Sequence, residues 1–278
     1  FKRLGLVIID EQHRFGVKQR EALLEKGERP DLLMLSATPI PQTLAQGLFM
    51  DLDVSTLSFY RQGRVQTHLI KENSIRSILP EIERVIAKRE QVYVVCPAVD
   101  KGERKNIRNV VDIERELVKL FGQDKVEALH GQMSSEEKEH ILKKFVQGEF
   151  NILVSTSLIE VGIDVHNANT MIIYNAEQFG LASLHQMRGR VGRGHQKGQC
   201  YLLSDQDREE SDRRLEALVK YDDGFKLSQI DLETRGMGDL LGTRQAGLPQ
   251  FYLVDFTEDL SILKQAQRAK TETENKQK

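Results

Sequence analysis

The sequence predicts an α/β protein built from parallel sheets. Short apolar runs alternate with amphipathic stretches along most of the 278 residues, and this alternation is typical of strands joined by helical crossovers. Residues 126–157 contain one complete unit of strand, helix and strand. The helix of that unit has Ser134 and Glu137 at the spacing of a capping box, and it stops at Gly148.

Composition places limits on the class of protein. The 40 basic and 42 acidic residues give a formal charge of −2, which excludes a strongly basic protein but leaves room for a local basic patch. No apolar stretch approaches 18 residues, so a membrane span is not expected and we predict a cytoplasmic protein. Cys96 and Cys200 lie in apolar runs without metal-ligand spacing, which indicates buried, reduced thiols. The chain opens without Met almost directly into a core strand, so we expect a piece of a longer protein.

The first block, residues 1–60, contains only part of a sheet. Residues 4–9 predict a buried strand, and residues 17–26 predict a helix that ends at Gly27. Residues 31–39 predict a second strand that runs into a loop. The polar, turn-rich residues 51–66 are interpreted as a linker to the next block.

The second block, residues 67–205, predicts a parallel-sheet domain of its own. Its expected elements, in chain order, are a strand at 68–73, a helix at 74–90, a strand at 91–99, a charged loop at 101–109, a helix at 110–121, the unit at 126–157, and strands at 170–175 and 198–204. Residues 207–247 then predict two helices around 222–225 and a Gly-rich segment, and the polar tail at 261–278 is expected to fray.

Two carboxylates follow the first strand directly. Asp10 and Glu11 stand at its carboxyl end, with His13 just beyond. Such a pair can hold Mg²⁺ through water and orient a water that attacks a phosphate, although solvated carboxylates at a strand end are equally ordinary. Ser36 and Thr38 follow the next strand, where their hydroxyls could bond the acidic tip or cap a helix.

A third strand end carries hydroxyl groups and glycine. Thr156, Glu160, Gly162 and Asp164 follow the apolar run 152–154. Small and hydroxyl residues at the carboxyl edge of a sheet suit backbone contacts with phosphates. An ordinary exit from a strand has the same composition, so this segment alone leaves both interpretations open.

The sharpest signal is the string "QMRGRVGRG". Arg188, Arg190 and Arg193 lie within six residues, separated by glycines. Guanidinium groups are forked, permanently charged donors that suit phosphate oxygens, and an arginine inserted across an interface can stabilise charge on a transferring phosphoryl group. A solvated basic turn is the alternative.

The string "DLETRGMGDLLGTRQAG" again mixes arginine and glycine. It contains Arg235, Arg244 and Gln245. No general hydrolase chemistry requires it, and as a bare pattern it is typical of a structured connection.

The order of these segments is more specific than any one of them. "DEQH", "SAT", "STSLIEVGIDV" and "QMRGRVGR" resemble motifs II, III, V and VI of the superfamily 2 helicases. "SATPIPQTLA", "LHGQM" and "FGLASLHQMRGRVGRG" narrow the resemblance to the group of double-stranded DNA translocases that contains RecG and Mfd. "DLETRGMGDLLGTRQAG" resembles the TRG (translocation in RecG) motif of that group, and "GTRQ" together with Gln12 favours the RecG branch. The resemblance covers all but the last twenty or so residues.

This resemblance implies an ATP- and Mg²⁺-dependent DNA helicase with two RecA-like domains. Residues 1–60 would be part of the first domain, residues 67–205 the second domain, and residues 206–260 the TRG helical hairpin and loop. The implied partners are double-stranded and branched DNA at stalled forks and recombination junctions, in DNA repair and recombination. The resemblance implies a bacterial, cytoplasmic protein that is a monomer when intact.

The resemblance also implies a role for each motif residue. Asp10 would hold Mg²⁺ through water and Glu11 would activate the attacking water, so Glu11, Arg190 and Arg193 would be the catalytic residues. Further ATP contacts would come from Gln186, Gly162 and Asp164. Coupling between the nucleotide and DNA would involve His13, Ser36, Thr38, Thr156, Glu160, Arg235, Arg244 and Gln245.

One part of the pattern is missing. No G-x-x-x-x-G-K-[ST] string occurs in the 278 residues, so nothing in them would wrap the β-phosphate. A wedge domain for branched DNA is missing as well. We therefore expect this chain alone to be inactive in ATP hydrolysis and unwinding. The main interpretation is a RecG-type translocase that remodels branched DNA. Its alternatives are an Mfd-type translocase and a non-catalytic DNA-binding or regulatory module.

Overall fold

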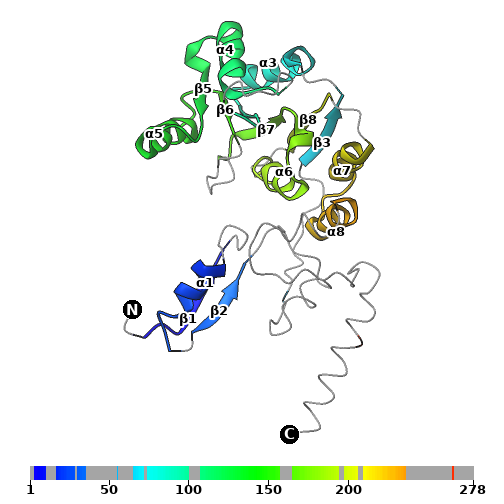
Figure 1. The fold of residues 1–278 in the computed structure, drawn as a ribbon. Helices are drawn as coiled ribbons and strands as arrows, with labels where there is room; N and C mark the ends of the chain where they lie inside the picture. Colours follow the sequence, from blue (N-terminus) through cyan, green and yellow to red (C-terminus); the bar gives the residue numbers. More distant parts are fainter. Residues whose placement is uncertain are drawn as a thin grey trace.

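The computed structural model describes two parallel-sheet units and a helical pair (Figure 1). The residues that it describes are 3–10, 17–28, 30–35, 55, 65–71, 74–99, 107–156, 165–193, 197–205, 209–235 and 265.

The larger unit is a six-stranded, entirely parallel sheet. Its strands are β3 (Val65–Ile70), β4 (Gln91–Val95), β5 (Val126–Leu129), β6 (Ile152–Ser155), β7 (Ala168–Ile173) and β8 (Gly198–Leu203). They lie in the order β3-β8-β7-β4-β6-β5. Because all strands are parallel, the segments that follow them emerge at one edge of the sheet.

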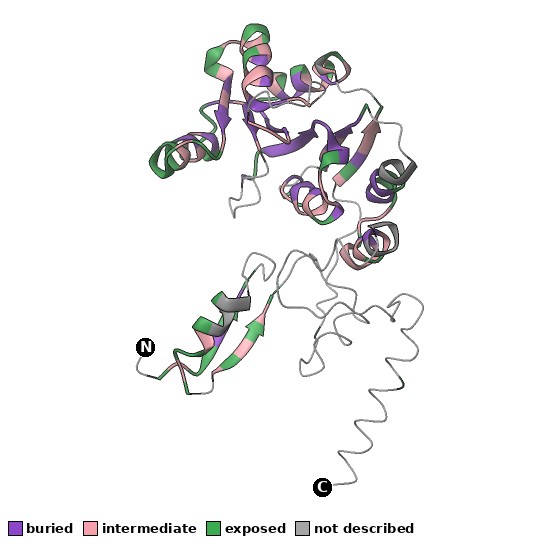
Figure 2. Cartoon of the chain, viewed as in Figure 1, coloured by how far each residue is buried: buried purple, intermediate pink, exposed green. Residues whose placement is uncertain are grey.

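Helices cover both faces of this sheet. They are α3 (Leu79–Ala87), α4 (Val110–Phe121), α5 (Ser135–Val146), α6 (Leu181–Arg188), α7 (Glu209–Lys220) and α8 (Gly224–Arg235), with short 3₁₀ turns η2 (Ile75–Ser77), η3 (Gln123–Lys125) and η5 (Ala176–Gln178). Side chains of α3 and α4 form one core, and side chains of α5, α6, α7 and α8 form the other. Figure 2 shows most of the strands buried between these layers, with β3 largely of intermediate exposure and exposed residues on the outer sides of the helices.

Strand β4 explains why the sheet needs two layers. Val92 and Val94 belong to the core under α3 and α4, whereas Tyr93 and Val95 belong to the core under α5 and α6. All five residues of β4 are buried, as expected for a central parallel strand whose alternate side chains enter opposite faces.

Local signals set the helix starts. Ser134 caps α5, since its hydroxyl accepts from the Glu137 amide at 3.2 Å while the Glu137 carboxylate accepts from the Ser134 amide at 2.8 Å. This reciprocal pair confirms the predicted capping box. Asn109 caps α4 by accepting from the amide of Asp112 at 2.9 Å.

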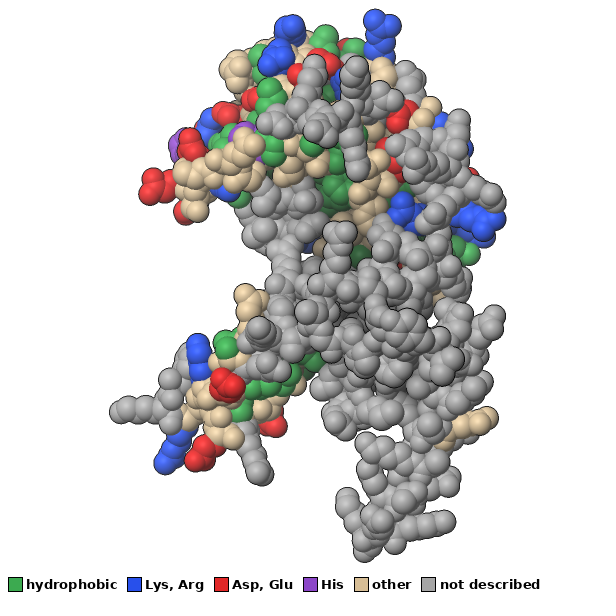
Figure 3. Space-filling view, viewed as in Figure 1, with side chains coloured by type: hydrophobic (Ala, Val, Ile, Leu, Met, Phe, Trp, Pro, Cys, Tyr) green, Lys and Arg blue, Asp and Glu red, His purple; other side chains and the backbone are tan. Residues whose placement is uncertain are grey.

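In its described residues, the smaller unit has two strands and one helix. Strands β1 (Leu6–Ile9) and β2 (Asp31–Met34) pair in parallel, and α1 (Val17–Leu24) connects them. Val7 and Ile9 are buried, but Leu6 and Ile8 are 51% and 58% exposed. The space-filling view shows hydrophobic side chains at the surface of this unit (Figure 3).

The predicted strands and helices are found in the described part of the chain, but some boundaries were wrong and helix α6 was not predicted. Strand β3 begins at Val65, so residues 65 and 66 belong to the sheet and not to the predicted linker. Helix α1 ends at Leu24, earlier than the predicted residue 26. Cys96 and Cys200 are buried free thiols, as predicted. Among the described residues, no helix is long and apolar enough to cross a membrane.

Candidate functional site

The arginine-glycine string lies at the carboxyl end of α6. Leu181, Leu184 and Met187 point into the core. Arg188 follows on the same helical face, four residues after Leu184, and its exposed fraction is only 3%. The sequence groups Arg188 with Arg190 and Arg193 in one basic string without giving it an ATP contact, and its burial separates it from the other two.

Arg188 is a structural anchor between α6 and the α7–α8 pair. Its Nη1 atom donates to the carbonyl oxygens of Leu218 (2.6 Å) and Tyr221 (3.0 Å), and Nη2 donates to that of Asp222 (3.3 Å). Nη1 also lies 3.3 Å from the Asp222 carboxylate. The guanidinium group thus binds carbonyl groups at the end of α7, which a helix otherwise leaves unpaired. This contact joins the predicted hairpin to the end of α6.

His185 completes this anchor. Its Nδ1 atom lies 2.8 Å from Arg188 Nη2. Because a guanidinium group only donates, Nδ1 must accept, and the proton of the neutral ring is then on Nε2. Burial, and next the positive charge of Arg188, lower the pKa of His185 to about 4, against the smaller opposing effects of Asp222 and Asp223. The ring is therefore neutral at pH 7.

The other two arginines of the string are placed differently. Arg190 is half-buried and Arg193 is exposed. Arg193 Nε donates to the carbonyl oxygen of Gly189 at 3.2 Å, which folds its stem back along the turn. Gln186, also half-buried, lies one helical turn before Arg190. Gln186, Arg190 and Arg193 therefore lie at and just after the end of α6, and all three are less buried than Arg188.

Glycine is required at two points near this turn. Gly192 has φ of 72°, in the left-handed region that favours glycine. A Cβ atom on Gly198, at the start of β8, would lie 2.8 Å from the backbone nitrogen of Gly192. The close approach of these two backbones fixes the turn after α6 against the sheet.

The remaining predicted residues are distributed over other elements. Thr156 is half-buried at the carboxyl end of β6, where its carbonyl oxygen accepts from the Ser155 hydroxyl at 2.9 Å. Asp10 is exposed at the carboxyl end of β1. Arg235 is the last residue of α8. Outside the described residues lie Glu11, His13, Ser36, Thr38, Glu160, Gly162, Asp164, Arg244 and Gln245.

The described surface carries side chains of both charges. Lys, Arg, Asp and Glu side chains are intermingled on the described surface in the view of Figure 3. Within the same described part of the chain, no three His, Cys, Asp or Glu side chains come together as a metal site would require.

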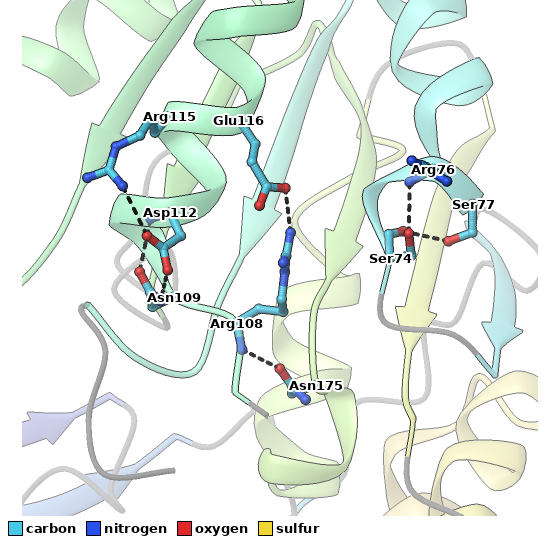
Figure 4. A network of polar contacts seen from close by, with 9 residues as sticks. All are labelled: Ser74, Arg76, Ser77, Arg108, Asn109, Asp112, Arg115, Glu116 and Asn175. Atoms are coloured by element: carbon cyan, nitrogen blue, oxygen red, sulfur yellow. Dashed lines mark hydrogen bonds and ion pairs between the residues drawn. The ribbon is translucent and has the colours of Figure 1, made fainter. Parts of the chain in front are cut away.

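Sequence reasoning missed two residues of this region. Arg188 could have been recognised as an anchor, because its spacing from Leu181 and Leu184 places it on the buried face of α6. Asn175, which follows β7, accepts a hydrogen bond from the backbone N–H of Arg108, which is distant in sequence (Figure 4), and no local pattern indicates such a contact.

The class of protein follows from the family comparison. A family model described as the helicase conserved C-terminal domain matches residues 72–195, which include β4 to β7 and the arginine-glycine string. The six-stranded unit is therefore a RecA-like helicase C-terminal domain, as the sequence predicted.

Curated relatives narrow the class. The ATP-dependent DNA helicase RecG of Streptococcus pneumoniae is 44% identical over 271 residues, which are 96% of this chain and 40% of the relative. The RecG of Thermotoga maritima is 44% identical over 269 residues, covering 96% of this chain and 34% of that protein. The chain belongs to the RecG family, and it spans about 40% or less of the length of these relatives.

A solved structure of the same family agrees in fold. The structure of RecG bound to a three-way DNA junction is 38% identical, with a TM-score of 0.66 over 95% of this chain and 34% of that one. The Dbp5 protein of Saccharomyces cerevisiae, bound to RNA and ADP BeF3, reaches a TM-score of 0.55 at 15% identity, which shows a similar fold and no more.

Proposed function

We propose that the intact protein is an ATP-driven double-stranded DNA translocase of RecG type that remodels branched DNA. The observation that supports this proposal is that the arginines at the end of α6 differ in burial. Arg188 is buried among carbonyl groups, while Arg190 and Arg193 lie outside the core next to it. The relatives, which include a RecG bound to a three-way DNA junction, support the choice of DNA as the substrate.

The proposed nucleotide site uses residues from both sheet units. Arg190 and Arg193, with Gln186, would contact ATP phosphates from the six-stranded unit, and Gly162 and Asp164 would lie nearby. Asp10 would hold Mg²⁺ through water and Glu11 would activate the attacking water. The exposed carboxylate of Asp10 at a strand end suits a cation that keeps its water ligands. ATP would supply the phosphoryl transfer that drives movement.

The proposed DNA coupling residues lie on several segments. Thr156 stands at the sheet edge and Arg235 at the end of α8; His13, Ser36, Thr38, Glu160, Arg244 and Gln245 would complete the set. In domain terms, residues 1–60 would be part of a first motor domain, residues 67–205 the second domain, residues 206–260 the TRG region and residues 261–278 a tail.

The arginine assignment has a direct test. In the intact protein, Arg193→Ala should abolish ATP turnover, because the transition-state charge loses a donor, while duplex binding falls by less than about threefold. DNA-stimulated ATP turnover and filter binding measure the two effects. Turnover that survives in Arg193→Ala would show that the phosphate assignment is wrong.

A second test concerns the 278-residue chain itself. We propose that it does not hydrolyse ATP, since no phosphate-binding loop string is present in its sequence. Phosphate release should stay at the buffer rate with and without a three-way junction. Turnover that depends on Arg193 would contradict this proposal.

A further inference from the structure

Strand β8 begins with a buried glycine. Gly198 is buried, as are Cys200 and Leu202, which follow it at alternate positions. Alternate residues of a strand share one face, and the side chains of Cys200 and Leu202 enter the core that α5, α6, α7 and α8 cover. Glycine weakens a strand, and inside one it often marks a place where another backbone approaches closely. The start of β8 therefore indicates such an approach.

The backbone that approaches Gly198 is the turn after α6. A Cβ atom on Gly198 would lie 2.8 Å from the nitrogen of Gly192, 3.0 Å from its Cα atom and 3.1 Å from the carbonyl carbon of Val191. Carbon atoms in contact are normally about 3.5–4.0 Å apart, so a methyl group at this position would overlap with all three. Because the three atoms belong to the backbone, no change of rotamer relieves the overlap. Either the turn or the strand would have to move.

The turn has little freedom to move. The N–H of Arg190 donates to the carbonyl oxygen of Met187 at 2.9 Å, which continues α6 as a tighter turn. Val191 is 2% exposed and belongs to the core, and Gly192 has φ of 72°. The turn is thus held by the core through Val191 and by the start of β8 through Gly198.

Two arginines flank the backbone that is held in this way. Arg190 precedes Val191, and Arg193 follows Gly192 directly. Adjacent Cα atoms keep a separation of about 3.8 Å across a peptide bond, so a displaced Gly192 carries Arg193 with it. The Nε atom of Arg193 also donates to the carbonyl oxygen of Gly189 at 3.2 Å, at the beginning of the turn. The place of the arginines therefore depends on the place of the turn.

We infer that Gly198 is a positioning residue for Arg190 and Arg193. It has no side chain with which to bind a ligand, and it acts through the backbone of Val191 and Gly192. The inference rests on the proposed function, in which these two arginines contact ATP phosphates. A misplacement of about 1 Å can cost about 100-fold in rate, so a methyl group at position 198 should slow ATP turnover in a chain that still folds.

Two substitutions in β8 separate the place of the turn from the stability of the strand. Gly198→Ala adds one methyl group against the backbone of the turn. Cys200→Ala is the matched control, because it loosens the core on the same face of the same strand and leaves position 198 a glycine.

The first measurement is DNA-stimulated ATP turnover of the intact protein. In Gly198→Ala, kcat should fall about tenfold or more while the KM for ATP stays within about threefold, because the arginines act on charge that develops in the transition state. Cys200→Ala should leave both constants within about twofold. A similar fall of kcat in Cys200→Ala, or a kcat in Gly198→Ala that stays within about twofold of the unsubstituted protein, would overturn the inference.

The second measurement uses the 278-residue chain and does not depend on activity. In a ¹⁵N–¹H correlation spectrum, the amide signals of Val191, Gly192 and Arg193 should shift more in Gly198→Ala than in Cys200→Ala, and those of α4 should not shift in either. Equal shifts at the turn in the two variants would contradict the inference. The spectrum of an unfolded chain in Gly198→Ala would contradict it as well, because the glycine would then be needed for folding.

The two measurements separate this inference from the proposed function. If the unsubstituted intact protein shows no DNA-stimulated ATP turnover, the proposed function fails. The spectra then still decide whether Gly198 sets the place of the turn after α6.

Discussion

The six-stranded unit and the β1–β2 unit use the same kind of strand, but they differ in how it is covered. Every residue of β4, β6 and β7 is buried. In the smaller unit, Leu6 and Ile8 of β1 and Leu33 of β2 are 46% to 58% exposed. The strands of both units are rich in leucine, isoleucine and valine.

The difference shows that apolar strands do not determine their own burial. A parallel sheet buries alternate side chains in opposite faces, so each face needs its own layer of helices. The larger unit has α3 and α4 on one face and α5 to α8 on the other. Among the described residues of the smaller unit, Val7 and Ile9 are buried on one face of β1, and the opposite face has no comparable cover.

The largest expected loss of unfolding free energy comes from a substitution in the core of the larger unit. Phe145 of α5 is 0% exposed, and its ring lies 5.1 Å from those of Tyr93 and Phe150. Phe145→Ala should lower the free energy of unfolding by about 3–5 kcal/mol. Urea unfolding followed by far-UV circular dichroism measures it. Ile8→Ala is the matched substitution in the smaller unit and should change it by less than about 0.5 kcal/mol. Equal losses would contradict the comparison.

The next effect concerns the anchor between α6 and the helical pair. Arg188→Ala leaves the carbonyl groups of Leu218 and Tyr221 without their donor, and it should lower the free energy of unfolding by about 2–4 kcal/mol. Arg193→Ala, in the same string, should cost less than about 0.5 kcal/mol. The same unfolding experiment tests both. If Arg188→Ala lowers the free energy of unfolding by less than about 0.5 kcal/mol, as expected for an exposed residue, then α7 and α8 are held by other contacts.

The third prediction is that the free energy of unfolding depends on pH through His185. The pKa of His185 is about 4 in the folded chain and about 6.5 in the unfolded chain. The unfolded chain binds more protons between these values, so His185 contributes stability above pH 6.5 that is lost as the pH falls toward 4. The slope from this group is at most about 1.4 kcal/mol per pH unit.

His185→Asn isolates this group, because the Asn amide oxygen can accept from Arg188 without titrating. Unfolding of both proteins at pH 7, 6 and 5 should show a steeper loss for the unsubstituted chain. Parallel curves would mean that the pKa of His185 does not differ between the folded and the unfolded chain.

The smallest effect in free energy concerns the exposed face of the smaller unit. Ile8 and Leu33 are paired in the β1–β2 register, and adjacent exposed apolar side chains favour association between copies. Replacing both with Lys should lower the sedimentation-detected association of the chain and leave its unfolding within about 0.5 kcal/mol. Leu120→Lys, at an exposed residue of α4, is the control. Equal effects of the two substitutions would exclude a specific patch.

Much of the architecture could be predicted from the residues alone. The capping residues of α5 and the periodicity of α4 act within one helix, so a reader of the sequence finds them without knowing the fold. The ordered motifs likewise indicated a helicase domain, which the family comparison supports. The boundary at Val65 was missed because pairing with β8, far along the chain, extends β3 into a polar stretch.

Spacing and local composition indicated the family and most of the strands and helices, because they are properties of short segments, but they did not indicate helix α6. The folded chain was needed to show that Arg188 binds carbonyl groups while Arg190 and Arg193 are less buried, and that the Asn175 amide accepts from the distant N–H of Arg108. The physical reason is that the burial of a polar group depends on which distant segment reaches it. Three arginines of equal charge within six residues therefore differ in environment and in proposed role.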